Sequence, residues 1–170
     1  MEKITKQTTY LGNKIHQIKD YLQLDKNSDN RYHIHEVINK SLRFLDNELQ
    51  HSKILVELIF DDNISTSNMD IVHMMQVLNF LIKTCIQSLK NCIEPHLKIT
   101  TNKIKTNLYS ITITDNSSNS TTRTVSNLLA TPADETIDLI ICKNIIEAHG
   151  GILLSQASSS GNNIQFTLQE

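Results

Sequence analysis

The pattern of apolar and polar residues predicts that the chain begins with two helices. Apolar side chains recur at alternating spacings of four and three residues from Ile4 to Leu22, which favours a helix over residues 1–24. A second stripe of this kind predicts a helix over residues 36–51. The polar run between them, residues 25–30, allows the two helices to fold back as an antiparallel hairpin. Two such hairpins would bury both stripes in a dimeric four-helix bundle; the alternative is that both helices pack only within their own chain.

Strand and helix patterns follow one another through the rest of the chain. Short alternating or continuous apolar runs predict strands, and longer runs with an apolar residue every three or four positions predict helices. The expected strands are residues 54–60, 97–101, 108–114, 152–157 and 163–168, and the expected helices are residues 69–89 and 139–149. This order favours an α/β (α+β) two-layer sandwich with a mixed sheet covered by helices on one face. The predicted domains are a helical dimerisation hairpin, residues 1–52, and a sandwich domain, residues 53–170.

Composition and charge argue against several classes of partner. The chain has 170 residues, 39% hydrophobic content and a formal net charge of -2, so no basic surplus indicates binding to nucleic acid. No apolar run approaches the roughly 18 residues that a membrane span needs, and no charged-then-apolar leader opens the chain. Cys85, Cys92 and Cys142 lack the spacing of metal ligands, so we expect free thiols in a reducing, cytoplasmic setting.

Glycine is scarce, and its placement limits what the chain can bind. The chain has only 4 glycines: Gly12, Gly150, Gly151 and Gly161. Gly150 and Gly151 suit the end of the last predicted helix, where a left-handed residue and a chain reversal are needed. No glycine lies between residues 12 and 150, and main-chain amides that enclose a triphosphate normally require glycine for close approach. The sequence therefore offers no glycine-rich phosphate loop in that region.

Five strings of residues, in this order along the chain, resemble those of bacterial sensor histidine kinases. They are HQIKDYL (residues 16–22), QVLNFLIKTCIQSL (76–89), ITITDN (111–116), ICKNIIEAHGG (141–151) and GNNIQFTLQ (161–169). The first resembles the phosphoacceptor box of that family, and the others resemble elements of its ATP-binding domain, which belongs to the GHKL superfamily. The resemblance covers nearly the whole chain and implies a dimerisation hairpin followed by a domain of the histidine kinase ATPase fold.

The chain departs from the family where Mg²⁺-ATP would bind. Active members hold the metal and the nucleotide with two asparagines four residues apart, and Phe80 and Thr84 stand at those positions. Phe80 has no oxygen for a hard cation, and Thr84 has one neutral hydroxyl. The first glycine box, residues 115–119, has lost both glycines, and Asp138 puts a negative charge where the second glycine box would meet phosphate. We therefore expect no cofactor, and ATP with Mg²⁺ only if the chain is an active kinase.

Asp115 keeps the family's residue type in this degenerate pocket. The resemblance implies that its carboxylate accepts a hydrogen bond from the adenine amino group. An alternative interpretation is that Asp115 and Asn116 form a turn at the end of a strand, which these residue types favour. Asp115 and Thr84 are thus the candidate nucleotide-binding residues, and no metal site is expected.

The resemblance also implies a phosphoacceptor at His16. His16 lies outside the apolar seam, so its imidazole is expected to face solvent, as a nucleophile in phosphoryl transfer must. Lys19 and Asp20 lie three and four residues further on, on the same side of the helix; Asp20 would orient the ring and Lys19 would meet the phosphoryl charge. Gln17 replaces the family's glutamate, the base for attack on ATP. The alternative interpretation of His16 is an ordinary surface histidine.

Three functions are compatible with these features. The first is a histidine phosphotransferase, similar to the dimeric (ChpT-like) phosphotransferases, which passes phosphoryl groups between response regulators of a two-component phosphorelay through His16. The second is a non-catalytic pseudokinase that docks partners, and the third is the catalytic fragment of an active sensor histidine kinase. We rank them in that order, because the first explains both a retained acceptor histidine and a lost nucleotide pocket. It implies a homodimer through residues 1–24 and 36–51, with receiver domains of response regulators as partners.

Overall fold

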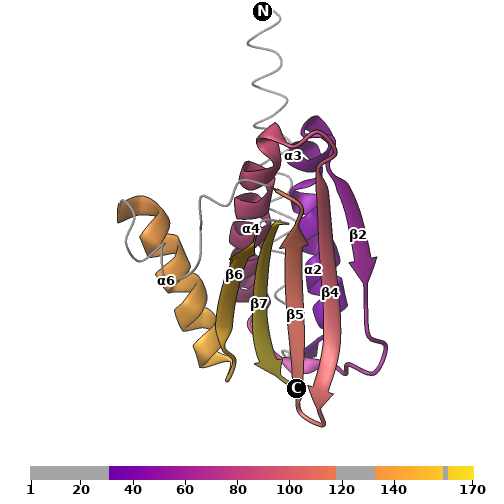
Figure 1. Cartoon of the computed structure of the whole chain (residues 1–170). Coiled ribbons are helices and arrows are strands. Elements are labelled where there is room, and N and C mark those ends of the chain that lie inside the picture. Colours follow the sequence, from indigo (N-terminus) through magenta and orange to yellow (C-terminus); the bar gives the residue numbers. More distant parts are fainter. Residues whose placement is uncertain (1–30, 118–132, 159–160) are drawn as a thin grey trace, which may run out of the picture. The chain divides into compact units, whose positions relative to one another are not determined.

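The computed structural model describes residues 31–117, 133–158 and 161–170 (Figure 1). Its helices are α2 (Ile34–Phe44), α3 (Asp46–His51), α4 (Ile71–Ser88) and α6 (Ala133–Ala148), with a short 3-10 helix, η1 (Leu89–Asn91), after α4. Its strands are β1 (Arg31–Tyr32), β2 (Leu55–Ile59), β3 (Ser67–Asn68), β4 (His96–Lys105), β5 (Leu108–Asp115), β6 (Leu153–Ser158) and β7 (Gly161–Gln169).

One mixed sheet organises these elements. Five strands pair in the order β2-β4-β5-β7-β6, and β1 pairs separately with β3. β2 runs parallel to β4, and the other neighbours in the large sheet are antiparallel. Helices α2 and α4 lie behind the sheet in Figure 1, and α6 lies beside β6. The predicted two-layer α/β sandwich with a mixed sheet is confirmed for the described residues. No helix among them is long and apolar enough to cross a membrane.

The core lies between the sheet and α4. Alternate residues of β5 point toward the helices, so Ile111 and Ile113 have no exposed surface while Thr112 between them keeps some. On α4, Leu78 and Ile82 lie one turn apart and are also fully buried. The buried face of β5 and the buried face of α4 therefore form the two sides of a single core, and both faces were predicted by their apolar periods.

α2 is part of this core. The apolar side chains Val37, Ile38 and Leu45 have no exposed surface, and α2 packs along α4. The apolar stripe of residues 36–51 had two predicted coverings, a bundle with residues 1–24 or packing within its own chain, and in the structure α2 packs against α4. An amphipathic stripe requires a covering surface without specifying which surface that is.

The start of the compact unit follows from this packing. The unit that the structure describes begins at Arg31. The boundary between residues 52 and 53, which the hydrophobic pattern predicts, stays a prediction. The candidate phosphoacceptor His16 lies in residues 1–30, outside the described residues, as do Lys19 and Asp20.

The two consecutive glycines after α6 are required by the path of the chain. Gly150 has a φ of 70°, the left-handed region in which a helix commonly ends. A Cβ atom on Gly151 would lie 1.8 Å from the carbonyl oxygen of Thr167. The predicted turn is therefore confirmed, and Gly151 allows the chain to pass directly against β7.

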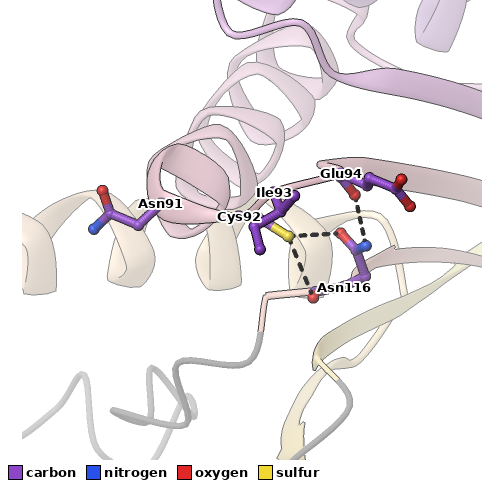
Figure 2. A pocket seen from close by; sticks show the side chains of 5 residues that line it. All are labelled: Asn91, Cys92, Ile93, Glu94 and Asn116. Carbon is purple, nitrogen blue, oxygen red and sulfur yellow. Dashed lines mark hydrogen bonds between the residues drawn. The ribbon is translucent and has the colours of Figure 1, made fainter.

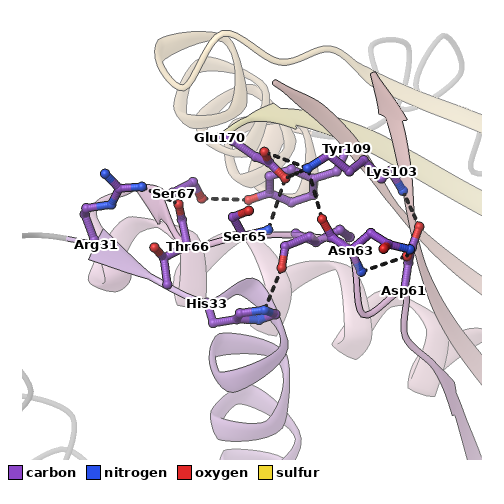
Figure 3. Close-up of polar contacts among 11 residues, drawn as sticks. Arg31, His33, Asp61, Asn63, Ser65, Thr66, Ser67, Lys103, Tyr109 and Glu170 are labelled. Carbon is purple, nitrogen blue, oxygen red and sulfur yellow. Dashed lines mark hydrogen bonds and ion pairs between the residues drawn. The ribbon is translucent and has the colours of Figure 1, made fainter. Parts of the chain in front are cut away.

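Polar contacts fix the segment between β2 and β3 (Figure 3). Asp61 Oδ2 accepts a hydrogen bond of 2.9 Å from the backbone N–H of Lys103, and Lys103 Nζ forms an ion pair of 2.8 Å with Glu170. The hydroxyls of Ser67 and Tyr109 lie 2.9 Å apart, and burial raises the pKa of Tyr109 to about 12. These contacts hold the start of β5, and the candidate residue Asp115 lies at its other end.

Candidate functional site

Phe80 and Thr84, which replace the two expected asparagines, are half-buried on α4. Thr84 Oγ1 donates a hydrogen bond of 3.0 Å to the carbonyl oxygen of Phe80. One turn later, Ser88 Oγ donates to the carbonyl oxygen of Thr84 at 3.1 Å. The hydroxyl of Thr84 therefore donates its hydrogen within its own helix and leaves one neutral oxygen, and Phe80 offers no oxygen. This pair does not fit Mg²⁺, which requires oxygen ligands.

Asp115, the last residue of β5, is buried, and groups of the chain itself occupy its carboxylate. Oδ1 accepts hydrogen bonds from the hydroxyl of Ser117 at 2.6 Å and from its backbone N–H at 3.0 Å. The side-chain amide of Asn162 reaches both oxygens, with Nδ2 at 3.2 Å from Oδ1 and 3.1 Å from Oδ2. Asp115 and Ser117 are each only 2% exposed. We call Asp115, Ser117, Asn162 and Cys85 the Asp115 cluster.

Cys85 joins this cluster from α4. Burial raises the pKa of the Cys85 thiol well above its usual value, and the charge of Asp115 and a hydrogen bond to it act in the same direction. Cys85 follows Thr84 in the helix, so the structure does bring the candidate residues Thr84 and Asp115 to the same region. Their polar groups are nevertheless engaged separately, because the hydroxyl of Thr84 is bonded to its own helix.

Asn116 closes the turn after β5. Its Oδ1 accepts from the backbone N–H of His96 at 2.8 Å, and its Nδ2 donates to the carbonyl oxygen of Glu94 at 2.8 Å. A shallow pocket of about 420 Å³ opens beside these contacts (Figure 2), lined by Asn91, Cys92, Ile93, Glu94 and Asn116. The amide of Asn116 is thus used for turn formation, and Glu94 is the charged residue of the lining, with a sign that would repel phosphate.

α6 begins earlier than the sequence suggested. Its first residue is Ala133, whereas the apolar pattern predicted a start at Leu139. Asp138 therefore lies inside α6, and the expectation that it stands at the amino end of this helix is wrong. Burial, together with the charge of Asp138 one turn away, raises the pKa of Cys142 to about 12. Among the residues described, no group of three or more His, Cys, Asp or Glu side chains is placed to hold a metal ion.

Comparison with known proteins gives similarity at the level of structure. No family model matches the chain, and no curated protein matches it. The nucleotide-free catalytic domain of histidine kinase ThkA superimposes with a TM-score of 0.71 at 16% identity, covering 82% of this chain and 93% of that one. Acinetobacter baumannii histidine kinase AdeS gives 0.66 at 17% identity, covering 97% and 79%. ThkA in complex with response regulator protein TrrA gives 0.67 at 18% identity, covering 95% and 48%.

The chain has the fold of histidine kinase catalytic domains. At these identities the likeness shows the fold and leaves open whether a nucleotide binds. Among the described residues, Phe80 lacks an oxygen, Thr84 donates its hydroxyl hydrogen within its own helix, and Asp115 is bonded within its cluster. We conclude that this set does not fit Mg²⁺-ATP.

Asn162, Ser117 and Cys85 were not predicted as functional residues. Asn162 lies 47 positions from Asp115 in the sequence, so only the pairing of β5 with β7 brings them together. Ser117 could have been recognised, since a serine two residues after an aspartate commonly bonds to it in an Asx turn. For Cys85, the sequence predicted only a free thiol.

Proposed function

We propose that this chain takes part in two-component signalling without using ATP as a phosphoryl donor. The observation that carries the proposal is the hydrogen bonding of Asp115: its two carboxylate oxygens accept hydrogen bonds from Ser117 and Asn162. An adenine amino group would have to displace these bonds to reach the carboxylate. Displacement without an equivalent replacement leaves buried polar groups unpaired, at a cost of about 1–3 kcal/mol for each group.

Any phosphoryl group that the chain carries must then come from another protein. In the first form of the proposal, His16 accepts it from a phosphorylated receiver domain and passes it to a second one, with Lys19 and Asp20 in supporting roles. An aspartyl phosphate is already reactive, so the replacement of the family's basic glutamate by Gln17 matters less for this exchange than for attack on ATP. The complex of ThkA with a response regulator supports receiver domains as the partner class.

The test of this form is transfer of label. Incubation with a radiolabelled, phosphorylated receiver domain should place acid-labile label on the chain, and His16→Ala should remove it. The matched control is His51→Ala, an exposed histidine in the described domain, which should keep the label. Label retained by the His16→Ala protein would exclude His16 as the acceptor.

The second form of the proposal is a pseudokinase that docks receiver domains without chemistry. The packing of α2 favours it, because the helix expected to complete a bundle with residues 1–24 is buried against α4. Binding of a receiver domain, measured by calorimetry, without any transfer of label would establish this second form. Autophosphorylation from Mg²⁺-ATP would overturn both forms and support an active kinase.

A further inference from the structure

The Asp115 cluster holds a buried carboxylate by means of neutral groups. The hydroxyl and backbone N–H of Ser117 and the side-chain amide of Asn162 donate hydrogen bonds to Asp115, and the buried Cys85 lies near it. The backbone N–H of Asn162 adds a longer contact of 3.4 Å to Oδ1. Several neutral donors together can replace the water that an ionised carboxylate loses on burial.

Asn162 has a particular place among these donors. Its Nδ2 atom lies 3.2 Å and 3.1 Å from the two oxygens of Asp115 and 3.0 Å from Oγ of Ser117. A planar nitrogen with two hydrogens thus lies among three acceptors. An amino group on an aromatic ring is also a planar nitrogen with two hydrogens, so it meets the same acceptors in the same way.

The backbone just before Asn162 lies very close to the backbone of Asp115. Gly161 has a φ of 134°, and a Cβ atom there would lie 1.8 Å from the carbonyl oxygen of Asp115. Glycine therefore allows the start of β7 to lie directly against the end of β5. Asn162 itself keeps some exposed surface, whereas Asp115 is 2% exposed. Truncation of the Asn162 side chain should consequently vacate the position without dismantling the core.

We infer that the side-chain amide of Asn162 occupies the place beside the Asp115 carboxylate where a base would bind. Removal of this side chain then allows a ring that carries an amino group, such as adenine, to bond to Asp115. The inference rests on the proposed function, because it names the residue that keeps the base out. The phosphate-binding glycines are absent in any case, so the ligand that should respond is the nucleoside and not the triphosphate.

The experiment measures nucleoside binding by isothermal titration calorimetry to the full chain and its variants. Asn162→Ala should bind adenosine at least about tenfold more tightly than the unaltered chain does, because Oδ2 of Asp115 then loses its bond to the Asn162 amide and can accept one from the base. Inosine, which has a carbonyl oxygen in place of the amino group, should show no such gain. Asn162→Ala combined with Asp115→Asn should lose the gain. Asn163→Ala, at the neighbouring exposed position of β7, is the matched control and should behave as the unaltered chain.

A cooperatively folded Asn162→Ala protein that binds adenosine no better than the unaltered chain would overturn the inference, and so would an equal gain for inosine. If the alanine variant does not unfold cooperatively, Asn162→Ser carries the same test, since its side chain is shorter but keeps a hydroxyl for Ser117. The proposed function fails separately, through autophosphorylation of the unaltered chain from Mg²⁺-ATP.

Discussion

At the scale of single residues, the described part of the chain contains a buried hydroxyl that its surroundings do not satisfy. Ser41 on α2 has no exposed surface, and its Oγ has no hydrogen-bond partner among the described residues. Ser41→Ala removes an unpaired polar group and introduces a better helix former. We expect the free energy of unfolding to rise by about 0.5–1 kcal/mol in urea titrations.

A matched comparison for Ser41 is Ser88, at the end of α4. Its hydroxyl donates to the carbonyl oxygen of Thr84 at 3.1 Å, so Ser88→Ala removes a made bond. The Ser88 variant should therefore gain less stability than the Ser41 variant. A Ser41→Ala protein less stable than the unaltered chain would show that the hydroxyl has a partner.

His35 gives the fold a dependence on pH. Its imidazole stacks on the ring of Phe60 at 4.2 Å, and its Nε2 lies 2.8 Å from the hydroxyl of Thr101. Burial lowers the pKa of His35 below 6.5, and the nearby charge of His33 lowers it further, while Asp62 and Asp61 oppose both effects. The unfolded chain therefore binds a proton at His35 more readily than the folded chain does. Its contribution to stability is complete above pH 6.5 and is lost as the pH falls through the folded-state pKa.

The measurement is the free energy of unfolding between pH 7.5 and about 5, a range that spans the ordinary pKa of histidine. His35→Gln should flatten the fall in stability on acidification. His51→Gln, at an exposed histidine of the same domain, is the control and should leave the slope unchanged. An unchanged slope in the His35 variant would assign the pH dependence to other groups.

At the scale of elements, the turn between α6 and β6 has the strictest spatial requirement. A Cβ on Gly151 would lie 1.8 Å from a backbone oxygen, whereas one on Gly150 would meet only the flexible side chain of Gln169. Gly151→Ala should therefore cost about 3 kcal/mol or more, and Gly150→Ala about 1 kcal/mol for its positive φ. Thermal unfolding of both variants checks the order. Equal losses would show that β7 yields easily at Thr167.

The sequence predicted the helices and strands that bury one face, but it predicted the residues at which they begin and end less accurately. The alternation in β5 and the helical spacing in α4 follow from the burial of one face, so those elements occur where they were expected. The first residues of α6, 133–136, show no apolar period, and its start was therefore missed. Their acidic members suit a helix start and were the available signal.

At the scale of the whole molecule, the sequence could not supply contacts that depend on topology. The stripe on α2 indicated burial, but only the packed structure identifies α4 as the covering surface. The bond between Asp115 and Asn162 likewise depends on the register of β5 with β7, in which Thr114 pairs with Asn163. The sequence named Asp115 as a candidate but could not supply its partners Ser117 and Asn162. The role of Asp115 in nucleotide binding stays a prediction. His16 remains a prediction from the sequence.

The extent of the folding unit gives the last prediction. A chain of residues 31–170 should unfold cooperatively, because it contains the whole described unit, including α2. A chain of residues 53–170, the predicted sandwich domain, should not. It lacks the fully buried Val37, Ile38 and Leu45, each worth about 1.5–3 kcal/mol on burial, and their sum approaches the total stability of a typical domain. Circular dichroism with urea titration of both truncated chains decides the matter. A cooperative transition for residues 53–170 would support the predicted boundary between residues 52 and 53.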